Sequence, residues 1–459
     1  MAARSPGLNI FDESKPMWRL FFVFLIPLML SNVLQSASQT FNSIFMGRMI
    51  GVHALAAVSA IFPVIFLLIS FLIGIASGST VLIGQAFGAR DARTMKRIAG
   101  TTLSVSLVLG FAAGIIGLVW ARPMLALVGT PADILNDSTA YARVIFGYLP
   151  MFFPYLVYTT FLRGTGDAKT PLYFLLLSTV LGLFFTPAFI RGWFGLPQTG
   201  VESAAWASFI ANGAAFAGML LYLHVSKHPL RFDREMMRDL APDWGLLRKI
   251  VRIGIPAGLQ MIMVALAEIA VLSFVNSFGS NATAAYGAVN QIIGYVQFPA
   301  MSIGITASIF GAQCIGARRE DKLGGVIHSG IVLNYVIGIM LITICYVFSY
   351  PLLRWFITDS HTLEIAHTLL MLTLWSFVLF GNTAVLSGVM RSSGTVVWPT
   401  AISIFSIWGV EVPAAYLLMH HYGLNGVWLG YPIAFCVGLG LQTLYYKLVW
   451  KKLTHERLI

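Results

Sequence analysis

Long apolar stretches recur along the whole chain, separated by short polar breaks. A helix needs about 20 mostly apolar residues to cross the hydrocarbon core of a bilayer. Of the 459 residues, 58% are hydrophobic and 10% are charged, whereas soluble domains carry about 25% charged residues. A water-soluble fold could not bury so much apolar surface. The sequence therefore predicts an all-α membrane protein that crosses the bilayer many times.

Apolar windows predict twelve transmembrane helices. In the first half they fall near 18–44, 53–82, 95–119, 136–158, 168–189 and 201–223. In the second half they fall near 249–274, 282–312, 323–348, 363–388, 395–418 and 424–447. With this layout, 24 of the 29 Lys and Arg residues lie on the side of the two termini and 5 on the other side. Because cytoplasmic loops carry the positive excess, both termini are predicted to be cytoplasmic, in a bacterial inner membrane.

The second half repeats motifs of the first at an offset of about 229 residues. Pro27 matches Pro256, QAFGAR (85–90) matches QCIGAR (313–318), and LRGTGDAKTP (162–171) matches MRSSGTVVWP (390–399). Each copy begins and ends on the cytoplasmic side, so the two copies are parallel repeats. Parallel repeats of this kind place a substrate site near the midplane between the halves. The predicted organisation is an amino-terminal six-helix lobe (1–223), a cytoplasmic linker (224–248) and a carboxy-terminal six-helix lobe (249–459).

These motifs resemble the multidrug and toxic compound extrusion (MATE) family. LRGTGDAKTP is similar to the family's R-G-x-G-D-x-x-x-P element between helices four and five, and FNSIFMGRMIGVHALAA (41–57) to its first-helix signature. GQAFGAR (84–90) and SAAWAS (203–208) resemble two further family elements. The resemblance implies a V-shaped bundle of two lobes around a central cavity. It also implies export of amphipathic or cationic organic compounds in exchange for protons or sodium ions, with no cofactor beyond the coupling ion.

Polar residues within the predicted helices are candidates for the cavity and the coupling site. The first helix has a polar stripe that spans about 120° of its circumference, formed by Asn32, Gln35, Ser36, Gln39 and Asn42. Such a stripe favours the wall of a water-filled cavity over interhelical hydrogen bonding. Opposite wall residues are predicted on the eighth and tenth helices, with packing as an equal alternative: Tyr286, Asn290, Gln297 and Asn382. At Asn42 the family signature has an acid, so the amino-lobe coupling position carries an amide that cannot release a proton.

Two carboxylates lie inside predicted helices, Glu268 in the seventh and Glu411 in the eleventh. A charge at the bilayer centre costs roughly 2.5–3.5 kcal/mol on insertion scales, so intramembrane acids mark ion paths by default. Both helices run outward from the cytoplasm and both acids lie past the midpoint, at similar depth. We expect Glu268 to be the main coupling site and Glu411 the secondary one. The alternative for Glu411 is a structural position near the outer interface, paired with His420 or His421.

Other classes of protein fit the sequence less well. A flippase of the same superfamily, moving a lipid-linked or anionic precursor, would need several basic residues within helices, and only Arg143 comes near. The matched motifs argue against a carrier of the major facilitator type. No nucleotide-binding or metalloprotease motif is found, so neither an ATP-driven pump nor an enzyme is predicted. The expected partners are drug-like organic cations and the lipid bilayer, with no nucleic acid and no metal, in a monomer.

Overall fold

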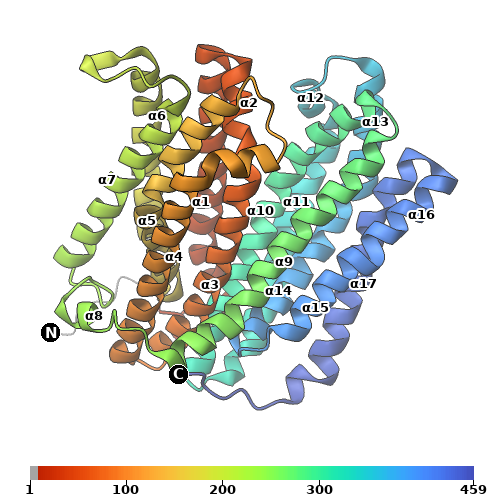
Figure 1. Cartoon of the computed structure of the whole chain (residues 1–459). Coiled ribbons are helices and arrows are strands. Elements are labelled where there is room, and N and C mark those ends of the chain that lie inside the picture. Colours follow the sequence, from red (N-terminus) through yellow and green to blue (C-terminus); the bar gives the residue numbers. More distant parts are fainter. Residues whose placement is uncertain (1–8) are drawn as a thin grey trace. The chain divides into compact units, whose positions relative to one another are not determined.

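The computed structural model describes residues 9–459, and within this range it contains helices and no β-strand (Figure 1). Twelve segments of the described chain are long and apolar enough to cross a membrane, which confirms the predicted all-α architecture and number of spans. The spans are longer than predicted. The fourth, for example, covers Leu135–Gly164, where the apolar window predicts 136–158. Polar and basic residues can continue a helix into the interface, so apolar windows underestimate helix length.

The first six spans are built from the elements before residue 226. They are α1 (Met17–Phe45), the π-helix η1 (Met46–Ile50), α2 (Val52–Ala60), α3 (Phe62–Gly88), α4 (Ala92–Leu127), α5 (Leu135–Gly164), α6 (Lys169–Arg191), the 3₁₀ turns η2 (Trp193–Gly195) and η3 (Gly200–Glu202), and α7 (Ser203–Val225). A short helix, α8 (Arg234–Arg238), lies in the linker that follows. The first span joins α1 to η1, and the second joins α2 to α3.

The last six spans follow the linker. They are built from α9 (Trp244–Asn276), α10 (Ser280–Gly316), the 3₁₀ turn η4 (Glu320–Lys322), α11 (Leu323–Val347), α13 (Ser360–Thr373), η5 (Leu374–Ser376), α14 (Phe377–Ser392), α15 (Val397–Ile404), the π-helix η6 (Phe405–Glu411), α16 (Val412–Tyr422), α17 (Leu424–Leu448) and η7 (Trp450–Lys452). The short helix α12 (Ser349–Arg354) lies between the ninth and tenth spans.

The described chain divides into two compact units. Unit 1 comprises Leu30–Ile83 and Asp91–Gly254, and unit 2 comprises Asn9–Met29, Gly84–Arg90 and Ile255–Ile459. The divisions fall inside α1, α3 and α9, because this grouping follows packing. The lobes predicted from the sequence follow the repeat instead, and their bounds at 223 and 249 stay a prediction.

In unit 1, α4 runs beside α5 and α6 runs beside α7 (Figure 1). Glycines on α4 allow the first pair to approach closely, since a Cβ atom at Gly110 would lie 2.9 Å from the carbonyl oxygen of Leu149. The side chains of Phe146 and Phe153 on α5 are buried. On α4, Phe111 and Ile115 are more than half exposed, as expected for a face in contact with lipid.

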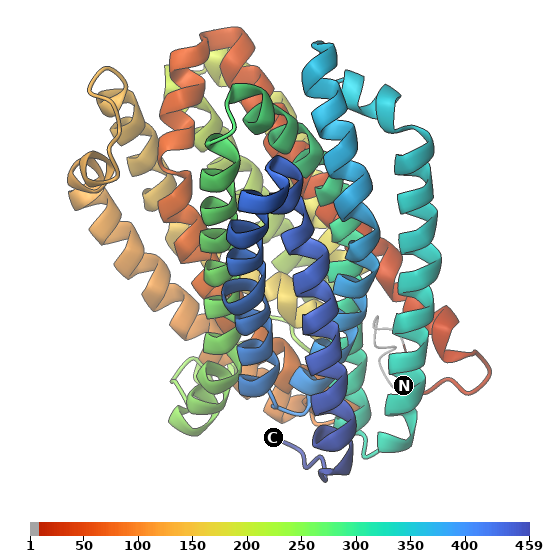
Figure 2. The same ribbon diagram turned by 90° about the vertical axis from the view of Figure 1, so that its right-hand side faces the viewer.

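In unit 2, α10 packs against α11, α13 and α14, and α16 packs against α17 (Figure 2). The start of α1 joins this unit through aromatic contacts, because Phe21 and Phe24 each lie 5.5 Å from the ring of Phe310 on α10. The helix α10 is therefore the centre of this unit, and it carries candidate site residues along its length.

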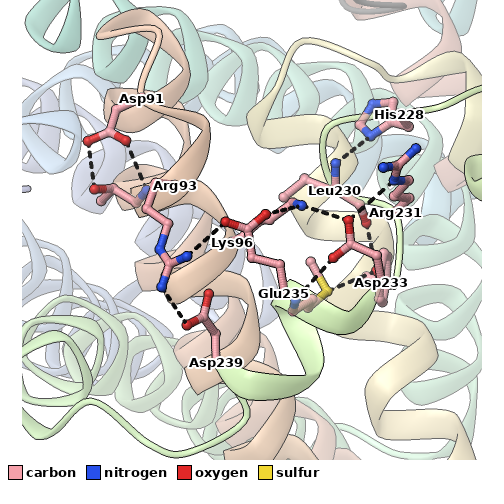
Figure 3. Close-up of polar contacts among 12 residues, drawn as sticks. Asp91, Arg93, Lys96, His228, Leu230, Arg231, Asp233, Glu235 and Asp239 are labelled. Carbon is pink, nitrogen blue, oxygen red and sulfur yellow. Dashed lines mark hydrogen bonds and ion pairs between the residues drawn. The ribbon is translucent and has the colours of Figure 1, made fainter.

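The linker is fixed to unit 1 by ion pairs (Figure 3). Lys96 on α4 is 9% exposed, and its Nζ lies 2.7 Å from Asp233 Oδ2 and 2.6 Å from Glu235 Oε2. Burial would raise the pKa of Asp233, but hydrogen bonds from Lys96, the Met236 amide and Arg231 outweigh it and lower the pKa to about 2. The linker is thus held as part of the amino-terminal unit.

Candidate functional site

The two intramembrane acids lie in unit 2 and interact electrostatically with each other. Glu268 on α9 is exposed, whereas Glu411, at the end of η6, is 5% exposed. Within residues 9–459 neither carboxylate forms an ion pair with a basic side chain. Acids without a basic partner inside a membrane protein are candidates for binding a proton or a cation.

The π-helix η6 ends at Glu411 and is hydrogen-bonded to the helix of Glu268. A π-helix widens the backbone by one residue and re-aims the side chains at its end, and such segments are frequent at functional sites. Pro413 follows directly in α16 and lacks the N–H that would continue a regular ladder. From the middle of η6, Trp408 Nε1 donates to the carbonyl oxygen of Met263 on α9 at 3.0 Å. This hydrogen bond ties the segment that ends at Glu411 to the helix that carries Glu268.

Two tyrosines join α10 to α17 beside the acids. The hydroxyls of Tyr286 and Tyr431 lie 2.9 Å apart, and both tyrosines interact electrostatically with Glu268 and Glu411. Asn290, one turn along α10, hydrogen-bonds to Tyr286. The predicted face of α10 therefore points toward the acid pair with at least two of its polar residues.

Trp428 on α17 adds an indole ring to the site. Trp428 is fully buried and stacks on Tyr286, with ring centroids 5.8 Å apart and planes inclined by 7°. Its Nε1 is buried and has no hydrogen-bond partner among the described residues. Buried polar groups without a partner are uncommon in native structures. Together the site combines two acids, two phenols and an amide, whose oxygen atoms suit a proton or a small cation, with an indole N–H donor on α17.

The predicted polar stripe on α1 lies in unit 1. Gln35 and Gln39 are exposed, and Asn32 is half-buried. Asn42 is half-buried and accepts a hydrogen bond from Thr186 Oγ1 on α6 at 3.2 Å. Exposure of the two glutamines fits a cavity wall, and the bond to Asn42 shows that this position also joins two helices. The assignment of the stripe to a cavity stays a prediction.

The two remaining predicted residues are Asn382 and Gln297. Asn382 on α14 is 4% exposed and accepts a hydrogen bond of 2.9 Å from Asn334 Nδ2 on α11. Gln297 on α10 is half-buried. The bond to Asn382 matches the packing alternative, and a role for either residue in a cavity stays a prediction.

Sequence reasoning missed Tyr431, Trp428 and Trp408. Each is an aromatic residue in an apolar helix, a composition typical of core packing. The available signal was the polar atom of each side chain, since a buried Tyr or Trp usually has a hydrogen-bond partner. Which partner it has depends on helix packing, which the sequence does not show.

The motif LRGTGDAKTP forms a turn. Gly166 has φ 82° and its repeat partner Gly394 has φ 78°, conformations that glycine adopts without strain. In the first copy Asp167 caps α6, because its Oδ1 accepts the amides of Lys169 at 3.1 Å and Thr170 at 3.0 Å. These residues therefore shape the connection between neighbouring spans.

Comparison with known proteins agrees with this architecture. The family model MatE matches residues 27–188 and again residues 256–417. The two matches start 229 residues apart, which confirms the predicted repeat.

Relatives match over nearly the whole chain. The probable multidrug resistance protein YoeA of Bacillus subtilis is 53% identical over 97% of each chain. A solved outward-facing structure of a multidrug resistance MATE family transporter of the MOP superfamily has a TM-score of 0.88 at 22% identity, covering 97% of this chain and 98% of that one. A MOP superfamily transporter from Pyrococcus furiosus has a TM-score of 0.85 at 22% identity, covering 94% and 95%. At this identity the two structures show a shared fold.

Proposed function

The chain belongs to the multidrug and toxic compound extrusion (MATE) family, and from this premise we propose that it is a secondary active antiporter that works by alternating access. Membership makes the protein a multi-pass membrane transporter and not an enzyme. In our proposal it exports amphipathic or cationic organic compounds in exchange for protons or sodium ions. It acts as a monomer in the bacterial inner membrane, with both termini in the cytoplasm.

The acid pair of unit 2 is the observation that carries the proposal. Two carboxylates that interact with each other, one of them buried, lie in spans that are predominantly apolar. Retaining unpaired acids there is costly, and their usual use is to bind the coupling ion. With Asn42 in place of the amino-lobe acid, ion binding falls to Glu268 and Glu411.

The two acids have different environments. Glu268 is exposed, and in our proposal it faces an aqueous path from which it takes up the ion, so we assign it the main coupling role. Glu411 is buried, interacts electrostatically with Tyr286 and Tyr431, and acts through its charge on Glu268. The transporter alternates between two conformations, and in our proposal the ion and the cationic substrate prefer different ones. An ion that binds the acid pair from outside therefore favours the conformation that releases the substrate.

The test is gradient-driven export from proteoliposomes with an imposed ΔpH or sodium gradient and a fluorescent organic cation as probe. Glu268→Gln should lower gradient-driven export by at least about tenfold, since a 1.4 kcal/mol loss of coupling already gives that factor. Glu268→Asp should retain part of the export, and Glu411→Gln should show a milder loss.

Glu364→Gln is the matched control. Glu364 is an exposed acid of the same unit that accepts a hydrogen bond from Tyr350 at 3.1 Å, and its loss should leave export unchanged. If Glu268→Gln is folded and its export keeps full dependence on the gradient, the assignment of the main site is wrong.

A further inference from the structure

The carboxy-terminal segment after α17, residues 449–459 (the tail), folds back onto unit 2. Its anchor is Trp450, which is 2% exposed and donates from Nε1 to Ser393 Oγ at 2.9 Å. The indole is stacked between Tyr446, at 5.5 Å, and His455, at 4.0 Å. Ser393 belongs to the turn after α14, so the tail is fastened to the connection between the tenth and eleventh spans.

A single buried glutamine joins the tail to α3. Gln85 is fully buried; its Nε2 donates to the carbonyl oxygen of Ser392 at 2.8 Å, and its Oε1 accepts from the Leu458 amide at 2.8 Å. The Leu458 side chain lies against Gly394, where a Cβ atom would be 2.9 Å from Leu458 Cδ1. Both polar ends of this side-chain amide are therefore used, one for the turn and one for the tail.

The same glutamine lies where α3 crosses α10. A Cβ atom on Gly316 would overlap the carbonyl oxygen of Gln85, and a Cβ atom on Gly88 would overlap that of Gln313. The contact is reciprocal: in each motif the glutamine backbone meets the glycine of the other motif. The two motifs, QAFG and QCIG, are the two copies of one repeated sequence. This close crossing is why Gly84–Arg90 groups with unit 2 although the rest of α3 groups with unit 1.

We propose that the tail is a latch that holds the end of α3 in unit 2 and must release when the two units change their relative position. The proposal rests on the alternating-access function above. Like α1 and α9, α3 has residues in both units, so a movement of one unit against the other requires α3 either to bend or to withdraw Gly84–Arg90 from unit 2. At the crossing the two helices meet through glycines, and the Gln85 side chain holds the end of α3 through two hydrogen bonds, one to Ser392 and one from Leu458. The tail supplies the second of these bonds.

The native thiol of Cys314 is a built-in reporter of this crossing. It is fully buried and is next to Gln313 on α10. In a background with Cys345→Ser and Cys436→Ser, we compare the rate of Cys314 labelling by a small maleimide in the full chain and in a chain lacking residues 453–459. Deletion should raise the labelling rate about fivefold, because one net hydrogen bond changes an opening equilibrium by roughly 2- to 12-fold. Trp450→Ala should raise it further.

Two controls make the result specific. Trp398→Ala removes a 61% exposed tryptophan of the same unit and should leave Cys314 labelling unchanged. Cys345 on α11, tested alone after Cys314→Ser and Cys436→Ser, should label equally with and without the tail. If Trp450→Ala does not fold, the deletion, which keeps Trp450, still decides the question.

Unchanged Cys314 labelling after deletion overturns the latch, and so does an equal rise at Cys345, which would mean general loosening of unit 2. Labelling needs neither substrate nor gradient, so its outcome is separate from the proposed function. If the deletion raises Cys314 labelling but the full chain shows no gradient-driven export, the antiporter is refuted while the tail still holds the crossing of α3 and α10. Unchanged labelling with normal export would refute the latch alone.

Discussion

Gly316→Ala tests whether the crossing of α3 and α10 is as close as the structure shows. The added methyl group would lie 2.6 Å from Gln85 Cα, whereas ordinary van der Waals contact begins at 3.4 Å. The two helices must separate by the missing distance, and the backbone atoms of Gln85 cannot move aside as a flexible side chain could. The separation would also disturb the hydrogen bonds of the Gln85 side chain to Ser392 and Leu458.

The change in the free energy of unfolding caused by Gly316→Ala has two parts of opposite sign. Forcing an extra methyl group into a packed contact costs about 1–3 kcal/mol. Replacing glycine by alanine in a helix recovers up to about 1 kcal/mol, and less at Gly316 because it is the last residue of α10. The net destabilisation is about 1–2 kcal/mol. For domains of 150–250 residues this lowers the melting temperature by roughly 2–8 °C.

Thermal unfolding in detergent, followed by tryptophan fluorescence, measures the effect. Gly294→Ala is the matched control, because Gly294 lies inside the same helix and a Cβ atom there would meet nothing within 4 Å. This variant should melt at or slightly above the temperature of the parent protein. If Gly316→Ala melts as high as Gly294→Ala, the reciprocal backbone contact is not present in solution and the reasoning fails.

Two further predictions concern unit 1. Cysteines at Gln35 and Gln39 should react with water-soluble thiol reagents in a substrate-dependent way, while one at Leu34 should stay inert; equal inertness at all three would leave the polar stripe as helix packing. Lys96→Met should lower stability at neutral pH by about 1–3 kcal/mol, less than the loss of a fully buried ion-pair partner because Asp233 is partly exposed. The pKa of Asp233 is lowered from 3.8 to about 2. The contribution of the Asp233 carboxylate to the free energy of unfolding is therefore complete above pH 3.8 and is lost as the pH falls through 2. The difference in melting temperature between parent and variant should therefore shrink over that range, and a constant difference would contradict the ion-pair account.

Local patterns in the sequence were enough to predict the spans and the repeat. Hydropathy depends on each segment alone, and the motifs around Pro27 and Pro256 repeat with their spacing intact. Helix ends were predicted too short, as at Gly164, because the interface accepts polar residues that an apolar window rejects.

The candidate site was predictable only in part. Glu268 and Glu411 could be found as acids in apolar helices, and their depth follows from helix direction. Their neighbours Tyr431 and Trp428 could not, because the rotation of α17 against α10 is set by packing between segments 145 residues apart. The π-helix before Glu411 leaves no mark in the sequence except the following Pro413, which also occurs in regular helices.

The docked tail has a practical consequence for anyone who purifies the protein. A fusion attached after Ile459 would begin two residues beyond Leu458, whose amide is bonded to Gln85 and whose side chain lies against Gly394. A bulky reporter there would compete with these contacts and alter the state under study. The connection between α6 and α7, residues 192–199, contains the 84% exposed Phe194 and is joined to neither Gln85 nor Ser393 by a described hydrogen bond. Affinity handles and fluorescent reporters are therefore better inserted in that loop than appended to the carboxy terminus.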